Sequence, residues 1–150
     1  MQVVDTTSRT DTPSEVITMD AASRMGSAVI RAMSDEFSIR ILESVVSEGK
    51  SVVEIHSETS VPVSTAYRLV HGMAEDGLIV PERVVVTGTG SKYVIYRAMF
   101  SRLSIDFDTT GCKVQGTPNW GVPDIMYRLS RFAEKHSAFP SCSITWTRSR

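Results

Sequence analysis

The fold is decided by residues 29–99, which read VIRAMSDEFSIRILESVVSEGKSVVEIHSETSVPVSTAYRLVHGMAEDGLIVPERVVVTGTGSKYVIYRAM. Apolar residues recur at helical spacing in three successive parts of this stretch. Two runs rich in β-branched and aromatic residues follow, separated by a Gly/Thr/Ser turn. We therefore expect three short helices followed by a β-hairpin.

The first two of these helices carry recognisable start signals. One begins at Ser34 or Asp35, both good N-cap residues, and ends before Gly49. Ser51 and Glu54 form an S-x-x-E capping box, which predicts a second helix reaching about residue 58.

The third helix is expected over 62–76, because proline is favoured in a first helical turn and Gly77 follows as a stop. A four-residue turn separates it from the preceding helix. The hairpin that follows has strands at 80–87 and 93–98. Its tip at 88–92 is flexible and polar.

Outward from this stretch, an apolar stripe predicts a helix over 20–33 with Asp20 as its N-cap. Gly26 either weakens that helix or lets another backbone approach closely. A second hairpin is expected around 103–115, because apolar residues alternate there and turn residues separate the two runs. The last amphipathic pattern, at 123–136, predicts a helix.

The predicted class is α+β, mainly α, with an extra C-terminal β-hairpin and helix. The domain organisation is a mobile tail at 1–16, a main domain at 20–100, a hairpin-plus-helix extension at 101–137 and a tail at 138–150. Hydrophobic residues make up 41% and charged residues 22% of the 150, as in soluble globular proteins.

No apolar run is long enough to cross a membrane, and no secretory signal peptide is visible, so we expect a cytoplasmic protein. The two cysteines, Cys112 and Cys142, do not form a disulfide framework. Isolated thiols are the favoured interpretation over a redox switch.

Charge is unevenly distributed. Residues 34–108 carry seven basic and eleven acidic residues, whereas 109–150 carry six basic and two acidic. The shorter stretch 62–98 is net positive, with four basic and three acidic residues. An acidic main domain counts against nucleic-acid binding, and the third helix with its hairpin counts for it.

The phrase MSDEFSIRILESV and the spacing of SVVEIHSETSVPVSTAYRLVHGMAEDGLI resemble the winged helix-turn-helix regulators of the ArsR type. VPVSTAYRL also resembles the recognition helix of the IclR family, and the 102–115 hairpin is similar to extensions in archaeal winged-helix proteins. The resemblance implies a transcription regulator that binds double-stranded DNA, with 62–76 in the major groove and 80–98 as the wing.

Metal sensing is not implied. Metal-sensing ArsR members carry cysteines in the second helix, where this chain has Ser51 to His56 instead. The three histidines, His56, His71 and His136, show no compact ligand spacing. No metal or cofactor is expected, and an effector ligand cannot be named from the sequence.

The candidate DNA-contacting residues lie on the predicted recognition helix and wing. Because the apolar stripe of 62–76 faces the core, the opposite face points outward. Arginine there can make a bidentate pair with guanine. The set is Ser64, Thr65, Tyr67, Arg68 and His71 on the helix, with Arg83, Lys92 and Arg97 on the wing. Arg40 either contacts phosphate or pairs with Glu36 or Glu43 on its own helix.

One module covers only a short DNA site, so we expect a homodimer on two half-sites. The candidate interface residues are Met25, Val29 and Ile30 on 20–33, with Met126, Leu129 and Phe132 on 123–136. The same residues alternatively cover the core of their own chain.

Two other functions remain as alternatives. The acidic charge favours a winged helix that docks a partner protein instead of DNA. An enzyme is disfavoured, because no nucleophile–base pair, phosphate-binding glycine loop or carboxylate pair appears in a recognisable setting.

Overall fold

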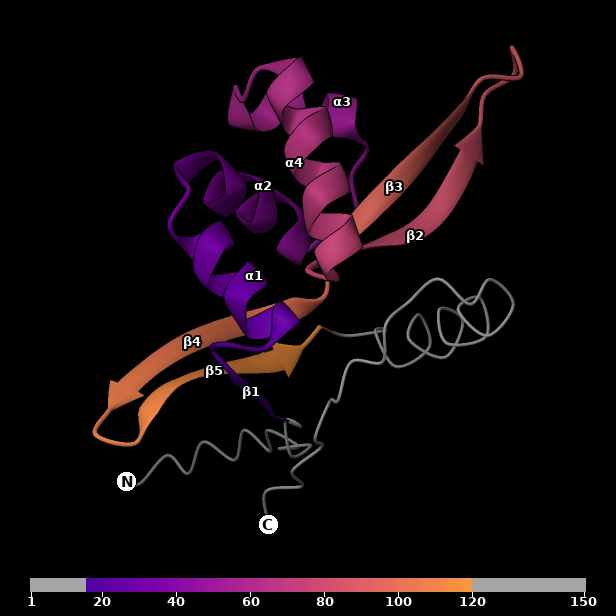
Figure 1. The fold of residues 1–150 in the computed structure, drawn as a ribbon. Coiled ribbons are helices and arrows are strands. Elements are labelled where there is room, and N and C mark those ends of the chain that lie inside the picture. Colours follow the sequence, from indigo (N-terminus) through magenta and orange to yellow (C-terminus); the bar gives the residue numbers. More distant parts are fainter. Residues whose placement is uncertain (1–15, 120–150) are drawn as a thin grey trace, which may run out of the picture.

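A computed structural model describes residues 16–119, which form a helical body with a β-hairpin projecting on each side (Figure 1). The helices are α1 (Arg24–Met33), α2 (Glu36–Val46), α3 (Val52–Thr59) and α4 (Val63–Asp76). The strands are β1 (Ile17–Asp20), β2 (Ile79–Val86), β3 (Lys92–Ala98), β4 (Phe100–Asp108) and β5 (Gly111–Pro118). The predicted α+β class is confirmed.

The start of α1 differs from the prediction. Its N-cap is Ser23, whose hydroxyl accepts from the Gly26 N–H, and Asp20 is instead the last residue of β1. The Asp20 carboxylate accepts from the Ala22 N–H at 2.7 Å and so shapes the turn between strand and helix. Gly26 lies directly against the Asp20 carbonyl, where any side chain would collide. Of the two alternatives considered for this glycine, the close backbone approach is the one observed.

The helices α2 and α3 begin as predicted. The Asp35 side chain caps α2 by accepting from the Ser38 N–H at 2.9 Å. Ser51 and Glu54 form a complete capping box on α3. Both helices therefore begin where their side chains satisfy free N–H groups.

The turn between α3 and α4 is held by three side-chain and backbone features. Ser60 ends α3 in the left-handed conformation with φ 58°. His56 Nδ1 donates to the Val61 carbonyl at 2.6 Å, and the Thr59 hydroxyl donates to the Ile55 carbonyl. Val61 is fully buried, so the turn is anchored in the core. This fixes α4 relative to α3.

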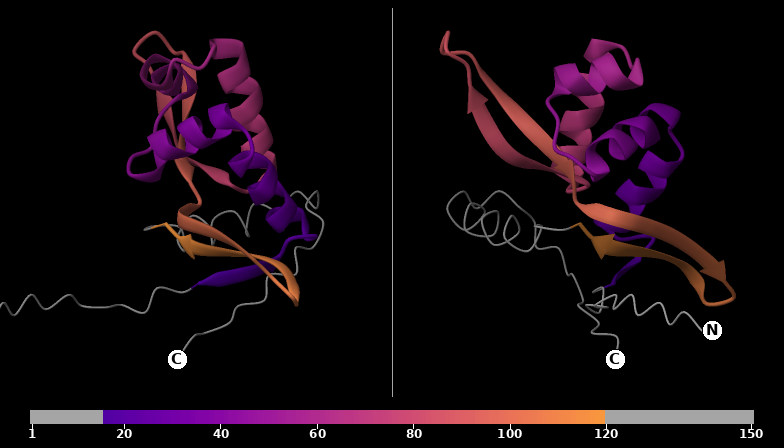
Figure 2. Two further views of the ribbon diagram at one scale, coloured as in Figure 1. Left: turned by 90° about the vertical axis from the view of Figure 1, so that its left-hand side faces the viewer. Right: turned by 180° about the vertical axis from the view of Figure 1, so that it is seen from behind.

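Two separate antiparallel sheets flank the helices. The strands β2 and β3 pair as a two-stranded ribbon, whereas β1, β5 and β4 form a three-stranded sheet in that order. Met99 alone separates β3 from β4, so one extended segment takes part in both sheets. Figure 2 shows the ribbons projecting in opposite directions from the helical body.

One core joins the helices to the three-stranded sheet. Val29, Ile41, Ile55 and Val70 come from the four helices and are fully buried. Strand residues complete the same cluster, among them Ile17, Ile79, Phe100 and Val114. The predicted extension therefore contributes to the same core as the main domain. None of the helices within residues 16–119 is long and apolar enough to span a membrane.

One residue predicted to lie in the dimer interface is buried within its own chain. Val29 has no exposed surface, because it packs inside the core of its own chain, so it is not available to a second subunit. Met25 and Ile30 pack partly buried against the same core. The candidates Met126, Leu129 and Phe132, the predicted helix 123–136, Cys142 and the tails 1–15 and 138–150 lie outside the described residues.

Candidate nucleic-acid interface

The outer face of α4 is the centre of the candidate site. Ser64, Tyr67, Arg68 and His71 are exposed there, while Ala66, Val70 and Met73 face the core. Thr65 is half-buried at the edge of this face. The predicted outward direction is therefore observed for four of the five candidates on this helix.

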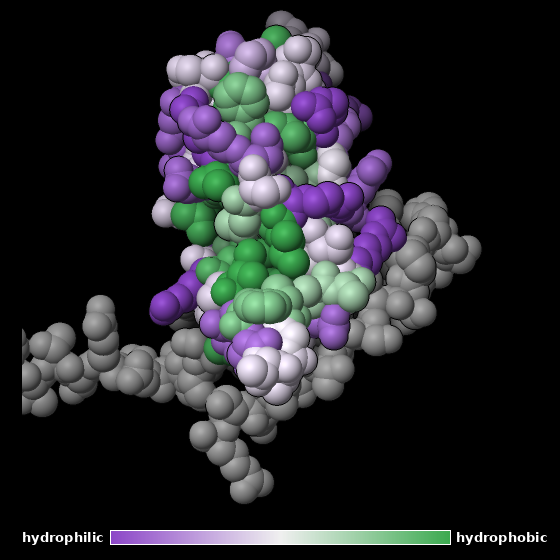
Figure 3. All heavy atoms as spheres, turned by 60° about the vertical axis from the view of Figure 1, so that its left-hand side comes forward, coloured by the Kyte–Doolittle hydropathy of each residue, from purple (hydrophilic) through white to green (hydrophobic). Residues whose placement is uncertain are grey.

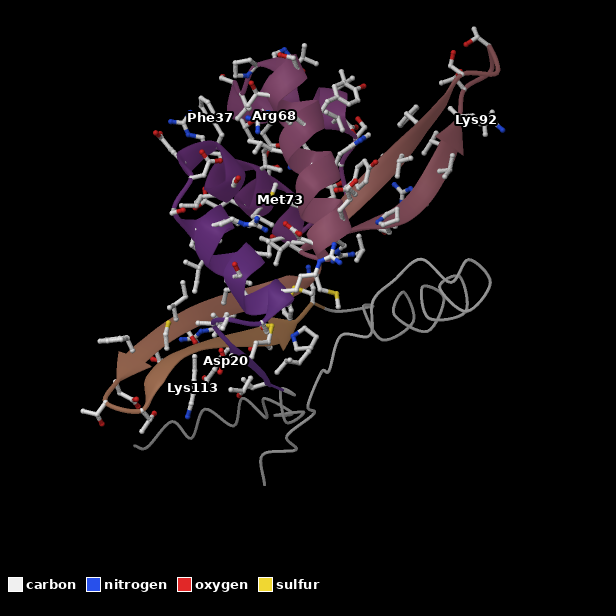
Figure 4. The ribbon with its side chains drawn as sticks, in the orientation of Figure 1. Asp20, Phe37, Arg68, Met73, Lys92 and Lys113 are labelled. Atoms are coloured by element: carbon white, nitrogen blue, oxygen red, sulfur yellow. The ribbon has the colours of Figure 1, made fainter. Side chains whose placement is uncertain are left out.

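Arg68 lies on the side of α4 that faces the start of α2. Two hydrogen bonds from Ser38 lower the pKa of the Asp35 carboxyl group below its ordinary value. The positive charge of Arg68 makes a smaller contribution in the same direction. Figure 4 shows Arg68 near Phe37 at the same end of the helical body. Among residues 16–119 Arg68 forms no ion pair within salt-bridge distance. Its guanidinium can therefore bind an external acceptor.

Tyr67 and His71 lie on the side of α4 that faces the ribbon β2–β3. Their rings meet edge to face, with centroids 6.2 Å apart. They line an open groove of about 520 Å³ between α4, the start of α3 and strand β3. The other lining residues are Ser51, Val52, Val53, Glu54, Lys92, Tyr93, Val94 and Tyr96. Burial raises the pKa of the Tyr96 phenol, so this group stays a neutral hydrogen-bond donor.

The ribbon β2–β3 carries an exposed lysine near its tip. Lys92 is the first residue of β3, is exposed and lies at the far end of the ribbon in Figure 4. The tip itself is held by Thr87, whose hydroxyl accepts from the Ser91 N–H at 3.1 Å. Arg83 is also exposed, and its guanidinium lies 3.8 Å from the Glu82 carboxylate. Two of the three predicted wing cations therefore face solvent.

Arg97, the third predicted wing cation, does not point away from the module. Its Nη2 donates to the Ser47 carbonyl at the end of α2, 3.3 Å away, and its Nε is buried. This arginine satisfies a carbonyl left free where a helix ends. This geometry disfavours the predicted DNA contact of Arg97, because its side chain links β3 to α2.

Some of the acidic residues of the module are engaged locally. Glu36 pairs with Arg40 on α2, and Glu58 pairs with Lys50. Glu54 serves the capping box, where two hydrogen bonds from Ser51 lower its pKa. Arg40 thus takes the second of the two roles considered from the sequence, pairing within its own helix.

Several exposed apolar residues near the site were missed by the sequence analysis. Phe37, Val53 and Val63 are exposed in the first turns of α2, α3 and α4, and Tyr93 follows Lys92 on β3. No sequence signal marks these residues, because apolar residues at these positions fit a buried face equally well. Within residues 16–119, no three His, Cys, Asp or Glu side chains lie together as a metal site.

The arrangement defines a class. The helices α3 and α4, the turn between them and the ribbon β2–β3 form a winged helix-turn-helix, with α4 in the position of the recognition helix and the ribbon as the wing. Residues 38–83 of this module match the family model of the IclR helix-turn-helix domain. The IclR resemblance of the α4 sequence is confirmed by this match.

Two solved structures are similar to the chain at low identity. One is the homodimeric winged helix-turn-helix DNA-binding domain of Mb0332 from Mycobacterium bovis, described as a possible ArsR-family transcriptional regulator. The sequence identity is 17% and the TM-score is 0.41. The match covers 75% of this chain and 82% of that chain. The other is NolR from Sinorhizobium fredii, with 15% identity, a TM-score of 0.35, and 72% and 83% coverage. No curated protein sequence matches the chain.

Proposed function

We propose that this protein is a transcription regulator that binds double-stranded DNA as a homodimer in the cytoplasm. The helix α4 enters the major groove, and the β2–β3 wing contacts the neighbouring backbone. The observation that carries the proposal is the exposed polar and basic face of α4, flanked by a projecting wing whose tip lysine is free. The IclR-type match over 38–83 supports the same conclusion.

The residues of this face have defined roles in the proposal. Arg68, free of ion pairs with described residues, reads guanine through O6 and N7. Ser64 donates to a base or a phosphate, and Tyr67 and His71 contact the backbone from the wing side of the helix. Lys92 and Arg83 contact phosphates, which contributes affinity without sequence preference.

A dimer is part of the proposal because a single module of this charge offers few phosphate contacts. Two modules on half-sites about one helical turn apart would combine their affinities. Met25 and Ile30 remain candidates for this interface, because both keep some exposed surface on α1.

The test is a fluorescence-anisotropy titration of the full chain with its own upstream DNA and with random duplex at several salt concentrations. The proposal expects tight, salt-dependent binding that prefers the upstream DNA. The slope against salt gives the number of phosphates contacted. No binding to either duplex at low salt would overturn it.

A protein-docking role is the second candidate, and a specific observation favours it. Phe37, Val53 and Val63 expose apolar surface in the first turns of α2, α3 and α4. Residues 34–108 are also acidic overall. Failure to bind DNA, together with a variant at Val53 that loses a captured and identified protein partner, would establish this alternative.

A further inference from the structure

An open apolar groove runs between α2 and β4, on the side of the helical body away from the wing. Its volume is about 400 Å³. The lining is mostly apolar and includes Met33, Ile39, Leu42, Val46, Phe100 and Leu103. Figure 3, which brings this side of the molecule forward, shows hydrophobic residues gathered in a band down the middle of the surface.

The apolar surface continues along β4 beyond the groove. Leu103, Ile105 and Phe107 alternate with polar residues and therefore share one face of the strand. Ile105 is 43% and Phe107 84% exposed. The strip from Phe100 to Phe107 is about 23 Å long at the rise of a β-strand. This length suits a single helix of about four turns.

The described chain ends at the rim of this groove. The Asn119 backbone N–H donates to the Met99 carbonyl, and its side-chain amide donates to the carbonyls of Val46 and Ala98 at 2.7 and 3.1 Å. Val46 and Ala98 both line the groove. Asn119 is buried, so the point at which the next segment starts is fixed.

The sequence that follows Asn119 contains an amphipathic segment that could pack in this groove. Residues 123–136 predict an amphipathic helix of about 21 Å, with proline at its first position. Its apolar stripe consists of Ile125, Met126, Leu129, Phe132 and Ala133. Its basic residues can pair with Glu43, which lines the groove together with Arg102 and forms no ion pair with any described residue. These basic residues are Arg128, Arg131 and Lys135.

We propose that residues 123–136 cover the α2–β4 groove of their own chain, with the apolar stripe facing Leu42 and Leu103. Only residues 120–122 lie between the fixed Asn119 and the segment, so Pro123 lies within about 14 Å of Asn119. So short a connection gives the segment a local concentration on the order of millimolar at this groove. The segment of the same chain therefore outcompetes a second copy of the chain for this groove. The proposed dimer then uses another surface.

The test places a benzophenone amino acid at Leu129 and, as a matched control, at Arg131 on the polar side of the predicted helix. Irradiation of the full chain, digestion and mass spectrometry identify the partners. The expected result is a crosslink from position 129 to peptides containing Leu42 or Leu103, at least several-fold stronger than from position 131. Absence of crosslinks from position 129 to these peptides would overturn the proposal.

Mixing labelled and unlabelled chains separates one chain from two. ¹⁵N-labelled and unlabelled protein are combined before irradiation. If the segment binds the groove of its own chain, both peptides of each crosslink are labelled or both are unlabelled. Mixed-isotope crosslinks would show that the segment of a second copy fills the groove, which contradicts the proposal. Neither outcome depends on whether the protein binds DNA.

A second measurement does not require an unnatural residue. Leu103→Ser should release the segment and raise the rate of tryptic cleavage after Arg128 and Arg131 about tenfold. Val84→Ser removes a similar apolar side chain from an exposed position on the wing and serves as the control. Equal cleavage rates in both variants and in the parent protein would count against docking, provided that circular dichroism shows all three folded.

Discussion

Among the arginines of the four helices, Arg24 and Arg68 form no ion pair with any residue that the structure describes. Arg31 pairs with Asp76 and Arg40 with Glu36. Arg68 instead lies in the field of Asp35, whose carboxylate is already engaged by two hydrogen bonds from Ser38. At the residue scale, the site thus consists of one available guanidinium on an exposed helix face.

We expect Arg68→Ala to reduce affinity for the specific DNA site by about 1–3 kcal/mol, because a bidentate guanine contact is lost. Anisotropy titrations against specific and random duplex measure this effect. Arg102→Ala is the matched control, since Arg102 is exposed on β4, away from the wing. Unchanged preference for the specific duplex would show that α4 does not read bases through Arg68.

Ser60 carries the other residue-scale prediction. Its φ of 58° is unfavourable for any residue with a side chain, yet the helix-turn-helix turn requires it. Ser60→Gly should therefore stabilise the protein by about 1 kcal/mol in denaturant unfolding. Gly77→Ala, at φ 83° and with Met25 Cε 2.9 Å from the added carbon, should destabilise it instead. A loss of stability on introducing glycine at position 60 would contradict this argument.

At the scale of elements, local signals determined most of what the sequence could predict. The helices α2, α3 and α4 were predictable because their caps and apolar stripes lie within each helix. The strand β1 was not, because its alternation of apolar and polar residues spans only four positions and its partner β5 lies far away in the sequence. In the site, the exposed face of α4 followed from periodicity, whereas the direction of Arg97 depends on the distant carbonyl of Ser47.

The wing carries a prediction at this scale. Lys92→Ala should weaken binding to specific and random duplex equally and lower the salt slope by about one unit, because one phosphate contact is lost. The matched control is Lys113→Ala on β5, a lysine of the opposite ribbon that Figure 4 shows far from Lys92. A changed base preference in the Lys92 variant would instead show that the wing reads sequence.

At the scale of the whole molecule, stability should depend on pH in the acidic range. Hydrogen bonds from Ser38 hold the pKa of Asp35 below 3.8, and hydrogen bonds from Ser51 hold the pKa of Glu54 below 4.5. Each folded-state pKa is depressed, so each group stabilises the fold above its unfolded pKa. This contribution is lost as pH falls through the folded value.

Asp35→Asn tests this dependence. Asparagine still caps α2 but does not titrate, so the variant should lose less stability than the parent protein between about pH 4 and pH 2. Urea unfolding at pH 6, 4, 3 and 2 measures the difference. An identical loss in both proteins would mean that Asp35 contributes nothing to acid unfolding.

The pairing of β1 with β5 has a consequence for how the chain is made. Ile17 lies opposite Gly116, so the two partners are separated by nearly the whole described sequence. During synthesis, residues 17–20 leave the ribosome well before β5 and have no strand to join until β5 emerges. We expect the helices, whose contacts are local, to form earlier and the β1–β5 ladder to close last. Pulsed hydrogen exchange during refolding would detect this as late protection of the Ala21 amide, which donates to the Cys112 carbonyl of β5, relative to the amides of α4.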